Sequence, residues 1–112
     1  MTEVVQPKAD WEPFRCDVVP EGDRARVTPF GEIDIATADE VEGLLAPLWN
    51  GGFREVVLDL SQVTFIDSSG LRAVVEASEA AARNRVALTV LPGPPAVQRA
   101  FELTGLAPRF FA

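Results

Sequence analysis

The hydrophobic pattern of the 112-residue chain predicts a small α/β domain, in which a mostly parallel four-stranded sheet with an edge hairpin packs against three or more helices. Strand-like and helix-like segments follow one another in the order strand, strand, helix, strand, helix, strand, helix. Two segments, 55–60 and 86–91, have uninterrupted apolar centres, which are typical of strands covered on both faces. The length suffices for one hydrophobic core, so we expect a flexible lead-in over residues 1–12 and a single domain over residues 13–112.

The first two strands are predicted from alternating apolar and polar side chains. Phe14, Cys16 and Val18 alternate with charged residues, and the turn-like sequence PEGD then leads to a second alternating run from Ala25. We expect Pro29 to mark the end of this second strand, because proline cannot donate a ladder hydrogen bond. Cys16 is expected to be a core residue, and as the one cysteine of the chain it forms no internal disulfide.

The predicted helices carry apolar stripes and recognisable end signals. Thr37 with Glu40 three residues later matches a capping box, and the helix that follows should kink or end early at Pro47. A second helix is predicted from about Ser68 to Arg83. The third follows the turn PGPP, with Pro95 near its first position. The terminal pair Phe110 and Phe111 is expected to pack back on the domain.

The charge of the chain narrows the possible partners. The formal net charge is −7, acidic residues are spread along the sequence, and no cluster of Lys or Arg offsets them. Such a surface repels phosphate backbones, so we expect no direct nucleic-acid binding and favour protein partners, basic ones in particular. No apolar run approaches the roughly 20 residues of a membrane helix, and the start of the chain lacks a signal-peptide pattern. The sequence therefore predicts a cytoplasmic protein without membrane insertion.

The residue inventory argues against an enzyme. The sequence contains no histidine, so a Ser-His-Asp triad cannot form, and it has neither a phosphate-binding loop nor a dinucleotide fingerprint. One cysteine and no histidine make a zinc site improbable. Asp59 and Asp67 could hold Mg²⁺ only as two carboxylates from different elements, which is a weak signal. We therefore predict no catalytic residue, metal or cofactor.

The segment FIDSSGLRAVV contains the most informative group of polar residues. It places Asp67, Ser68 and Ser69 where an apolar strand runs into the second helix. Asp and Ser are favoured at helix N-termini, where a side-chain cap contributes about 1 kcal/mol. Either Asp67 or Ser68 is expected to begin the helix. One cap needs only one such residue, which leaves Ser69 unexplained.

A helical projection separates the two serines. With about 100° per residue, the predicted buried stripe contains Leu71 and Val74, Ser69 projects nearly opposite its centre, and Ser68 falls near its flank. Ser69 is then the hydroxyl presented to solvent, and Gly70 beside it leaves room for another protein to approach. A phosphate on Ser69 would be tolerated by the free N–H groups and positive dipole of a helix start, and it would change what the surface binds.

The segment DLSQVTFIDSSGLRAVV resembles the signature of the STAS domain, specifically that of the bacterial anti-sigma factor antagonists. GEIDIATADEVEGLL resembles the earlier motif of the family, and LPGPPAVQRAFELTGL resembles its final strand and helix. The three segments occur in the family's order, and the resemblance runs from Phe14 to Leu106.

The resemblance implies a phosphorylation switch. Antagonists of this family bind an anti-sigma factor that is also a serine/threonine kinase, and thereby free a sigma factor. The kinase phosphorylates the antagonist, which then dissociates, and a serine phosphatase reverses the modification. The family's acceptor serine matches Ser69, and its acidic positions near the acceptor match Asp34 and Asp67.

The complete partner-binding surface that we predict consists of Asp34, Asp67, Ser68, Ser69, Gly70 and Arg72. Ser68 is the less favoured acceptor, and Asp34 could simply be a loop or N-terminal residue of the first helix. Two other functions remain open. The chain could be a non-switching STAS scaffold or transport-associated domain, or, on the general knowledge that some STAS domains contact nucleotides, a nucleotide sensor.

Overall fold

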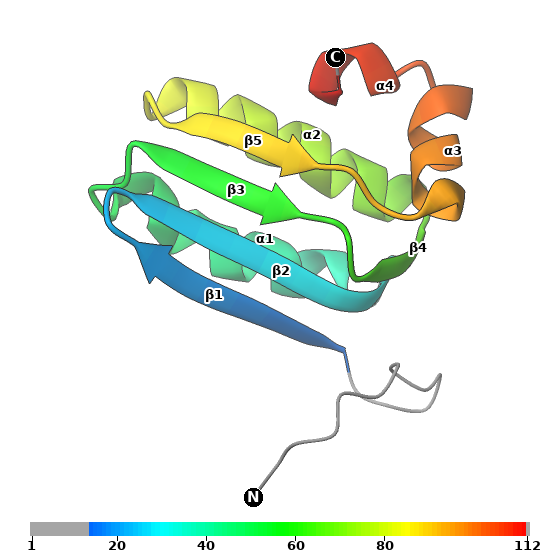
Figure 1. The fold of residues 1–112 in the computed structure, drawn as a ribbon, viewed down its shortest axis with the longest axis horizontal. Coiled ribbons are helices and arrows are strands. Elements are labelled where there is room, and N and C mark those ends of the chain that lie inside the picture. Colours follow the sequence, from blue (N-terminus) through cyan, green and yellow to red (C-terminus); the bar gives the residue numbers. More distant parts are fainter. Residues whose placement is uncertain (1–13, 112) are drawn as a thin grey trace, which may run out of the picture.

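The computed structural model describes residues 14–111, so the predicted lead-in over residues 1–12 lies outside the described residues. In chain order the elements are β1 (Arg15–Glu21), β2 (Arg24–Ile33), α1 (Ala38–Leu45), the 3-10 helix η1 (Ala46–Asn50), β3 (Glu55–Asp59), β4 (Val63–Ile66), α2 (Ser68–Arg83), β5 (Ala87–Leu91), α3 (Pro95–Leu103) and α4 (Ala107–Phe110). Helices α1 and α2 lie side by side behind the sheet, and α3 and α4 lie at one end of it (Figure 1).

The sheet is mostly parallel and has an antiparallel hairpin at one edge, as predicted. Its strands are ordered β1-β2-β3-β5; β1 and β2 are antiparallel, whereas β2-β3 and β3-β5 are parallel. The prediction of four strands was wrong, because a fifth strand, β4, pairs with β2 in parallel. β4 has only four residues, of which Thr64 and Phe65 are exposed, so it is too short to show a period.

Strand β2 is longer than predicted, and Pro29 does not end it. The strand continues to Ile33; residues 24–27 pair with β3 and residues 31–33 pair with β4. Pro29 lies between these two paired segments, where neither parallel ladder needs its missing N–H. The extension brings the end of β2 beside the end of β4.

Helix α1 ends early, as predicted from Pro47. The α-helix stops at Leu45, and η1 follows with the proline in its first turn. The predicted capping box was wrong, because the side chain of Thr37 caps no backbone N–H of α1. Its hydroxyl instead donates to the carbonyl oxygen of Glu32 at 2.7 Å. The Thr37 hydroxyl therefore bonds to the end of β2, whereas the sequence pattern had predicted that it would cap α1.

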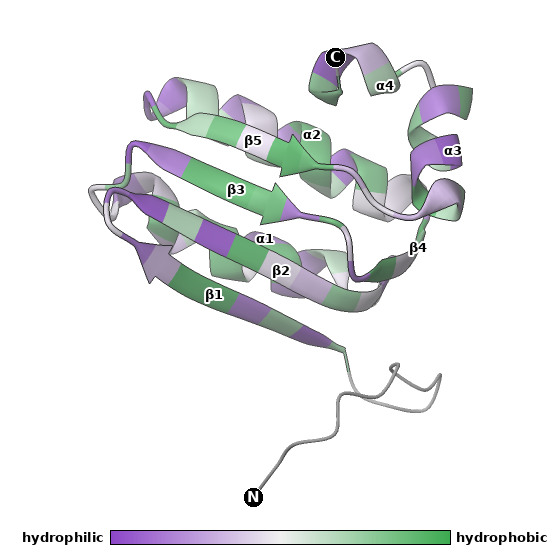
Figure 2. Ribbon diagram, in the orientation of Figure 1, coloured by the Kyte–Doolittle hydropathy of each residue, from purple (hydrophilic) through white to green (hydrophobic). Residues whose placement is uncertain are grey.

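The core lies between the sheet and helices α1, α2 and α3. Its largest fully buried side chains are Phe101, Ile33, Leu45, Leu58, Leu60, Val27, Val41, Val56, Val63, Val97 and Pro29. The alternation along β2 and the solid apolar centre of β3 are visible in Figure 2. β5 was wrongly predicted to be covered on both faces, since it is an edge strand with Ala87 and Thr89 exposed.

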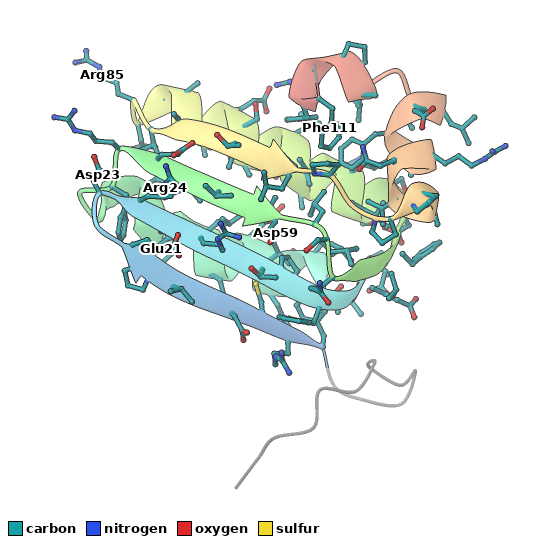
Figure 3. All side chains as sticks on the ribbon, in the orientation of Figure 1. Glu21, Asp23, Arg24, Asp59, Arg85 and Phe111 are labelled. Atoms are coloured by element: carbon teal, nitrogen blue, oxygen red, sulfur yellow. The ribbon has the colours of Figure 1, made fainter. Side chains whose placement is uncertain are left out.

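The C-terminal aromatic pair packs on the domain, as predicted. The ring centroids of Phe110 and Phe111 lie 5.9 and 5.1 Å from that of Phe101, both in edge-to-face geometry. Phe111 lies beneath α4 in Figure 3. These contacts close the core at the α3 end of the sheet.

Charged side chains cover the sheet face opposite α1 and α2, where Figure 3 labels Glu21, Arg24 and Asp59. The buried carboxylate of Asp59 contacts the guanidinium of Arg26 at 3.4 Å and accepts a hydrogen bond from the Ser61 N–H at 2.9 Å. Arg24 forms an ion pair of 3.0 Å with a glutamate of β3. The carboxylate of Asp59 therefore belongs to this ion-pair network, and both of its oxygens already have partners.

Candidate functional site

Two acidic residues predicted for the site, Asp34 and Asp67, directly follow neighbouring parallel strands. The last residues of those strands, Ile33 of β2 and Ile66 of β4, are paired in register. The N–H of Asp67 also donates to the carbonyl oxygen of Ile33 at 3.2 Å. The carboxyl ends of adjacent parallel strands are where α/β folds gather their binding residues. The structure thus brings together two segments that are far apart in the sequence.

Asp67 is the N-cap of α2. It has an extended backbone, with φ −107° and ψ −170°, and its Oδ1 accepts the N–H groups of Ser69 at 2.9 Å and Gly70 at 3.1 Å. The choice that the sequence left open between Asp67 and Ser68 is therefore decided for Asp67. One expectation fails as a result. The N–H groups of Ser69 and Gly70 are already bonded, so they are not free to receive a phosphate.

Gly70 does not leave room for a partner, and this prediction was wrong. The residue is buried, and a Cβ placed on it would lie 2.5 Å from the carbonyl oxygen of Ile33 and 2.6 Å from Cγ1 of Ile66. Glycine is needed because the first turn of α2 presses against the ends of β2 and β4. Its role is to set the distance between the helix and the strand ends.

The predicted order of exposure of the two serines was also wrong. Ser68 is exposed, whereas Ser69 is half-buried. The buried residues of α2 are Gly70, Leu71, Ala73, Val74, Ala77 and Ala81. The helical projection placed the buried stripe from the large apolar residues and left out the alanines. In the structure, Gly70 and the alanines form much of the buried face of α2. With about 100° per residue, this buried face turns Ser68 further from the core than Ser69.

Asp34 organises the loop between β2 and α1. Its Oδ1 accepts the N–H groups of Ala36 at 2.9 Å and Thr37 at 3.1 Å. Its own N–H donates to Oγ1 of Thr37 at 2.9 Å, and that hydroxyl donates in turn to the carbonyl oxygen of Glu32. Asp34 is thus a loop residue at the entry to α1, one of the two roles that the sequence allowed. These bonds hold the loop in one conformation.

The loop exposes a residue that the sequence reasoning missed. Ile35 is 81% exposed, the largest fraction among the six exposed large apolar side chains of the described chain. A second of these, Phe65, is 48% exposed and lies two residues before Asp67. The available signal was an isoleucine directly after Asp34, outside both the strand and the helix pattern. Arg72 lies on the first turns of α2 and is exposed, as expected for a surface residue.

The surface beside this loop is acidic. The first turn of α1 carries Asp39 and Glu40, and the helix contains no basic residue. The pKa of the Glu42 carboxyl is raised above its ordinary range by desolvation first, and then by the charges of Glu76 and Asp39 and a hydrogen bond to Glu76. Carboxylates from the middle of α1 and of α2 therefore lie close to one another. A partner that covers this surface needs positive charge.

Other chemistry is limited in the described part of the chain. Between residues 14 and 111, no group of three or more His, Cys, Asp or Glu side chains is arranged to hold a metal ion. Within the same range, no helix has the length and apolar character needed to cross a membrane. The candidate site therefore consists of Ser69, whose N–H is bonded to Asp67, of the carboxylates of Asp34 and Asp67, and of the exposed side chain of Ile35.

Comparison with known proteins identifies the family. The STAS domain model matches residues 19–111. The chain belongs to the STAS domain family. Over 76 residues this STAS domain is 36% identical to the anti-sigma-B factor antagonist of Staphylococcus aureus strain NCTC 8325 / PS 47, which covers 68% of the chain and 70% of the relative. The resemblance seen in the sequence is thereby confirmed.

Solved structures agree with the fold. An anti-sigma factor antagonist from Mycobacterium paratuberculosis superposes on this STAS domain with a TM-score of 0.79 and 28% identity, over 88% of this chain and 84% of the other. SpoIIAA in its unphosphorylated form gives 0.72 at 18% identity, over 88% and 86% of the two chains. The phosphorylated form of Bacillus SpoIIAA gives 0.66 at 18% identity, over 88% and 89%. At 18% identity, SpoIIAA supports the fold alone.

Proposed function

We propose that this STAS domain is an anti-sigma factor antagonist controlled by phosphorylation of Ser69. In the unphosphorylated form it binds an anti-sigma factor that is a serine/threonine kinase, and a sigma factor is released. Phosphorylation ends the binding, and a serine phosphatase restores it. This activity belongs in the cytoplasm, where sigma factors act.

One observation carries the proposal. Ser69 is fixed at the start of α2 through its N–H bond to Asp67, and Asp67 is bonded to the end of β2, where the Asp34 loop begins. A modifiable hydroxyl therefore lies on a rigid frame next to acidic residues of a second segment. The names of the relatives and the position of Ser69 in the family motif support the same function.

The proposed modification is a phosphoryl transfer from ATP. The Ser69 hydroxyl oxygen forms a bond to the γ-phosphorus, the bond from that phosphorus to the β–γ bridging oxygen breaks, and ADP leaves. The hydroxyl proton passes to a base of the kinase. The STAS domain contributes position only, since the nucleotide and the base belong to the kinase.

The local bonds explain why a phosphate would act as an off switch. It would add about two negative charges beside Asp67, whose Oδ1 has already taken the two nearest N–H groups. The new charge would find no free amide at Ser69 or Gly70 and would remain exposed to the partner. Covering this bulky, charged group with a partner costs its desolvation, and we expect that cost to weaken the complex.

A second candidate is a non-switching scaffold, and the half-burial of Ser69 favours it. In that role both serines only form the first helical turn, and the domain holds a partner constitutively. The two functions differ in one respect, because a scaffold has the same affinity for its partner whatever the state of Ser69.

The test is a kinase assay with separate serine variants. Each anti-sigma factor kinase of the source organism is purified and incubated with ATP and the wild-type chain, Ser68→Ala or Ser69→Ala. The proposal predicts phosphate incorporation into wild type and Ser68→Ala, and none into Ser69→Ala. Incorporation that survives Ser69→Ala and disappears in Ser68→Ala would move the switch to Ser68. No incorporation by any kinase would favour the scaffold.

A further inference from the structure

Ile35 is held in an exposed position by a network of polar bonds. The side chain is 81% exposed, although Asp34 on one side and Thr37 on the other are tied by hydrogen bonds of 2.7 to 3.1 Å. Large apolar side chains are commonly exposed singly, so exposure alone does not mark a binding residue. Here the backbone is ordered before any partner arrives, so little conformational entropy is lost on binding.

We propose that Ile35 is the apolar anchor by which this domain binds its anti-sigma factor kinase, and that the kinase receives it in an apolar pocket edged by basic side chains. The inference rests on the proposed function and adds a residue and a pocket chemistry to it. Fixed apolar side chains that enter a partner's pocket typically dominate binding, whereas charges at the rim steer the encounter.

Two observations favour the kinase as the partner that binds Ile35. The first is continuity, since Ile35 follows Asp34, which adjoins the Asp67–Ser69 turn through the paired ends of β2 and β4. A protein that contacts Ser69 during phosphoryl transfer is therefore close to the loop. The second is charge, because the exposed Glu32, Asp39 and Glu40 border the loop and α1 carries no basic residue. An acidic border disfavours a second copy of this chain, whose net charge is also −7.

The experiment measures binding of the kinase that phosphorylates the wild-type chain most efficiently. Isothermal titration with ADP present compares wild type, Ile35→Ser and the matched control Leu103→Ser. Leu103 is 75% exposed and is the last residue of α3. Figure 1 shows that the end of α3 next to α4 lies away from the end of β2. Ile35→Ser is expected to raise the Kd at least about tenfold, and Leu103→Ser to change it less than about twofold.

The same variants separate an anchor from a residue that acts in phosphoryl transfer. Loss of Ile35 should raise the KM for phosphorylation of Ser69 and leave kcat unchanged, because the side chain does not contact the reacting atoms. It should leave the salt dependence of binding unchanged, whereas the double variant Asp39→Asn, Glu40→Gln should reduce that dependence.

Three outcomes would overturn the inference. Equal Kd values for wild type and Ile35→Ser overturn it and leave the proposed function standing. A wild-type dimer that Ile35→Ser dissociates, seen by sedimentation equilibrium, assigns the loop to a second copy instead. Absence of wild-type binding to any anti-sigma factor kinase overturns the proposed function and this inference with it.

Discussion

Gly70 of α2 lies against Ile33 of β2 so closely that a Cβ on the glycine would come within 2.5 Å of the isoleucine's carbonyl oxygen. That same oxygen accepts the N–H of Asp67. One carbonyl thus contacts both the cap of α2 and its first turn. The next residue, Asp34, starts the loop that presents Ile35. The two halves of the candidate site are therefore joined through Ile33.

Replacing Gly70 with alanine should damage the fold. The atom that the new methyl group meets is backbone, which cannot move aside as a flexible side chain can, so we expect a loss of about 3 kcal/mol in the free energy of unfolding. Urea denaturation measures it. The matched control is Gly43→Ala in α1, where a Cβ meets nothing within 4 Å. That variant should gain about 0.5–1 kcal/mol. Equal stability of the two variants would contradict the close packing.

Substitution of Asp67 should separate capping from charge. Asn retains the oxygen that accepts the Ser69 and Gly70 N–H groups, whereas Ala removes it. We expect Asp67→Ala to lower the free energy of unfolding by about 1 kcal/mol and Asp67→Asn to change it by only a few tenths. Thermal denaturation followed by circular dichroism distinguishes them. If both variants lose the same stability, the carboxylate acts through its charge and not as a cap.

Local signals in the sequence were sufficient to place α1, α2, α3 and the hairpin, but not the end of β2 or the short helix α4. The bounds of α2 follow from Asp67 and the apolar spacing after it, and the short α1 follows from Pro47. Such features depend on residues within a few positions of one another, so they can be predicted from a single sequence.

Features that depend on distant contacts could not be predicted. β4 exists because it pairs with the end of β2, and the burial of Gly70 comes from Ile33, which is distant in the sequence. Thr37 does not cap α1 as predicted, because its hydroxyl bonds to the carbonyl oxygen of Glu32 and to the carboxylate of Asp34 instead. The positions of Asp34 and Asp67 in one site came from the family resemblance, and the register of β2 and β4 supplied the physical reason.

Cys16 should be a poor nucleophile. Burial raises the pKa of its thiol to about 11, with smaller contributions from the charges of Asp17 and Glu40. The folded chain then keeps the proton that the unfolded chain loses near its ordinary pKa of 9.0, so stability falls as the pH rises from about 9 to 11. At pH 8, iodoacetamide should react about 100-fold more slowly with folded than with unfolded protein. Similar rates would show that the thiol is accessible and its pKa is unshifted.

Phe111 should stabilise the C-terminal end of the domain. Its ring contacts that of Phe101 edge to face at 5.1 Å and is half-buried. We expect Phe111→Ala to lower the free energy of unfolding by about 1–3 kcal/mol, measured by urea denaturation. Phe111→Leu should recover most of that loss because it restores apolar contact area. An unchanged midpoint in Phe111→Ala would mean that the tail does not close the core in solution.

The most direct test of the switch is a pair of titrations with one anti-sigma factor kinase in the presence of ADP. One uses the unmodified chain, and the other uses the chain carrying phosphoserine at position 69. Circular dichroism of both forms verifies that the modification leaves the fold intact. We predict tight binding of the unmodified chain and a Kd at least about 100-fold higher for the phosphorylated one, a difference of about 2.7 kcal/mol. Equal affinity of the two folded forms would contradict the switch and make the domain a constitutive scaffold.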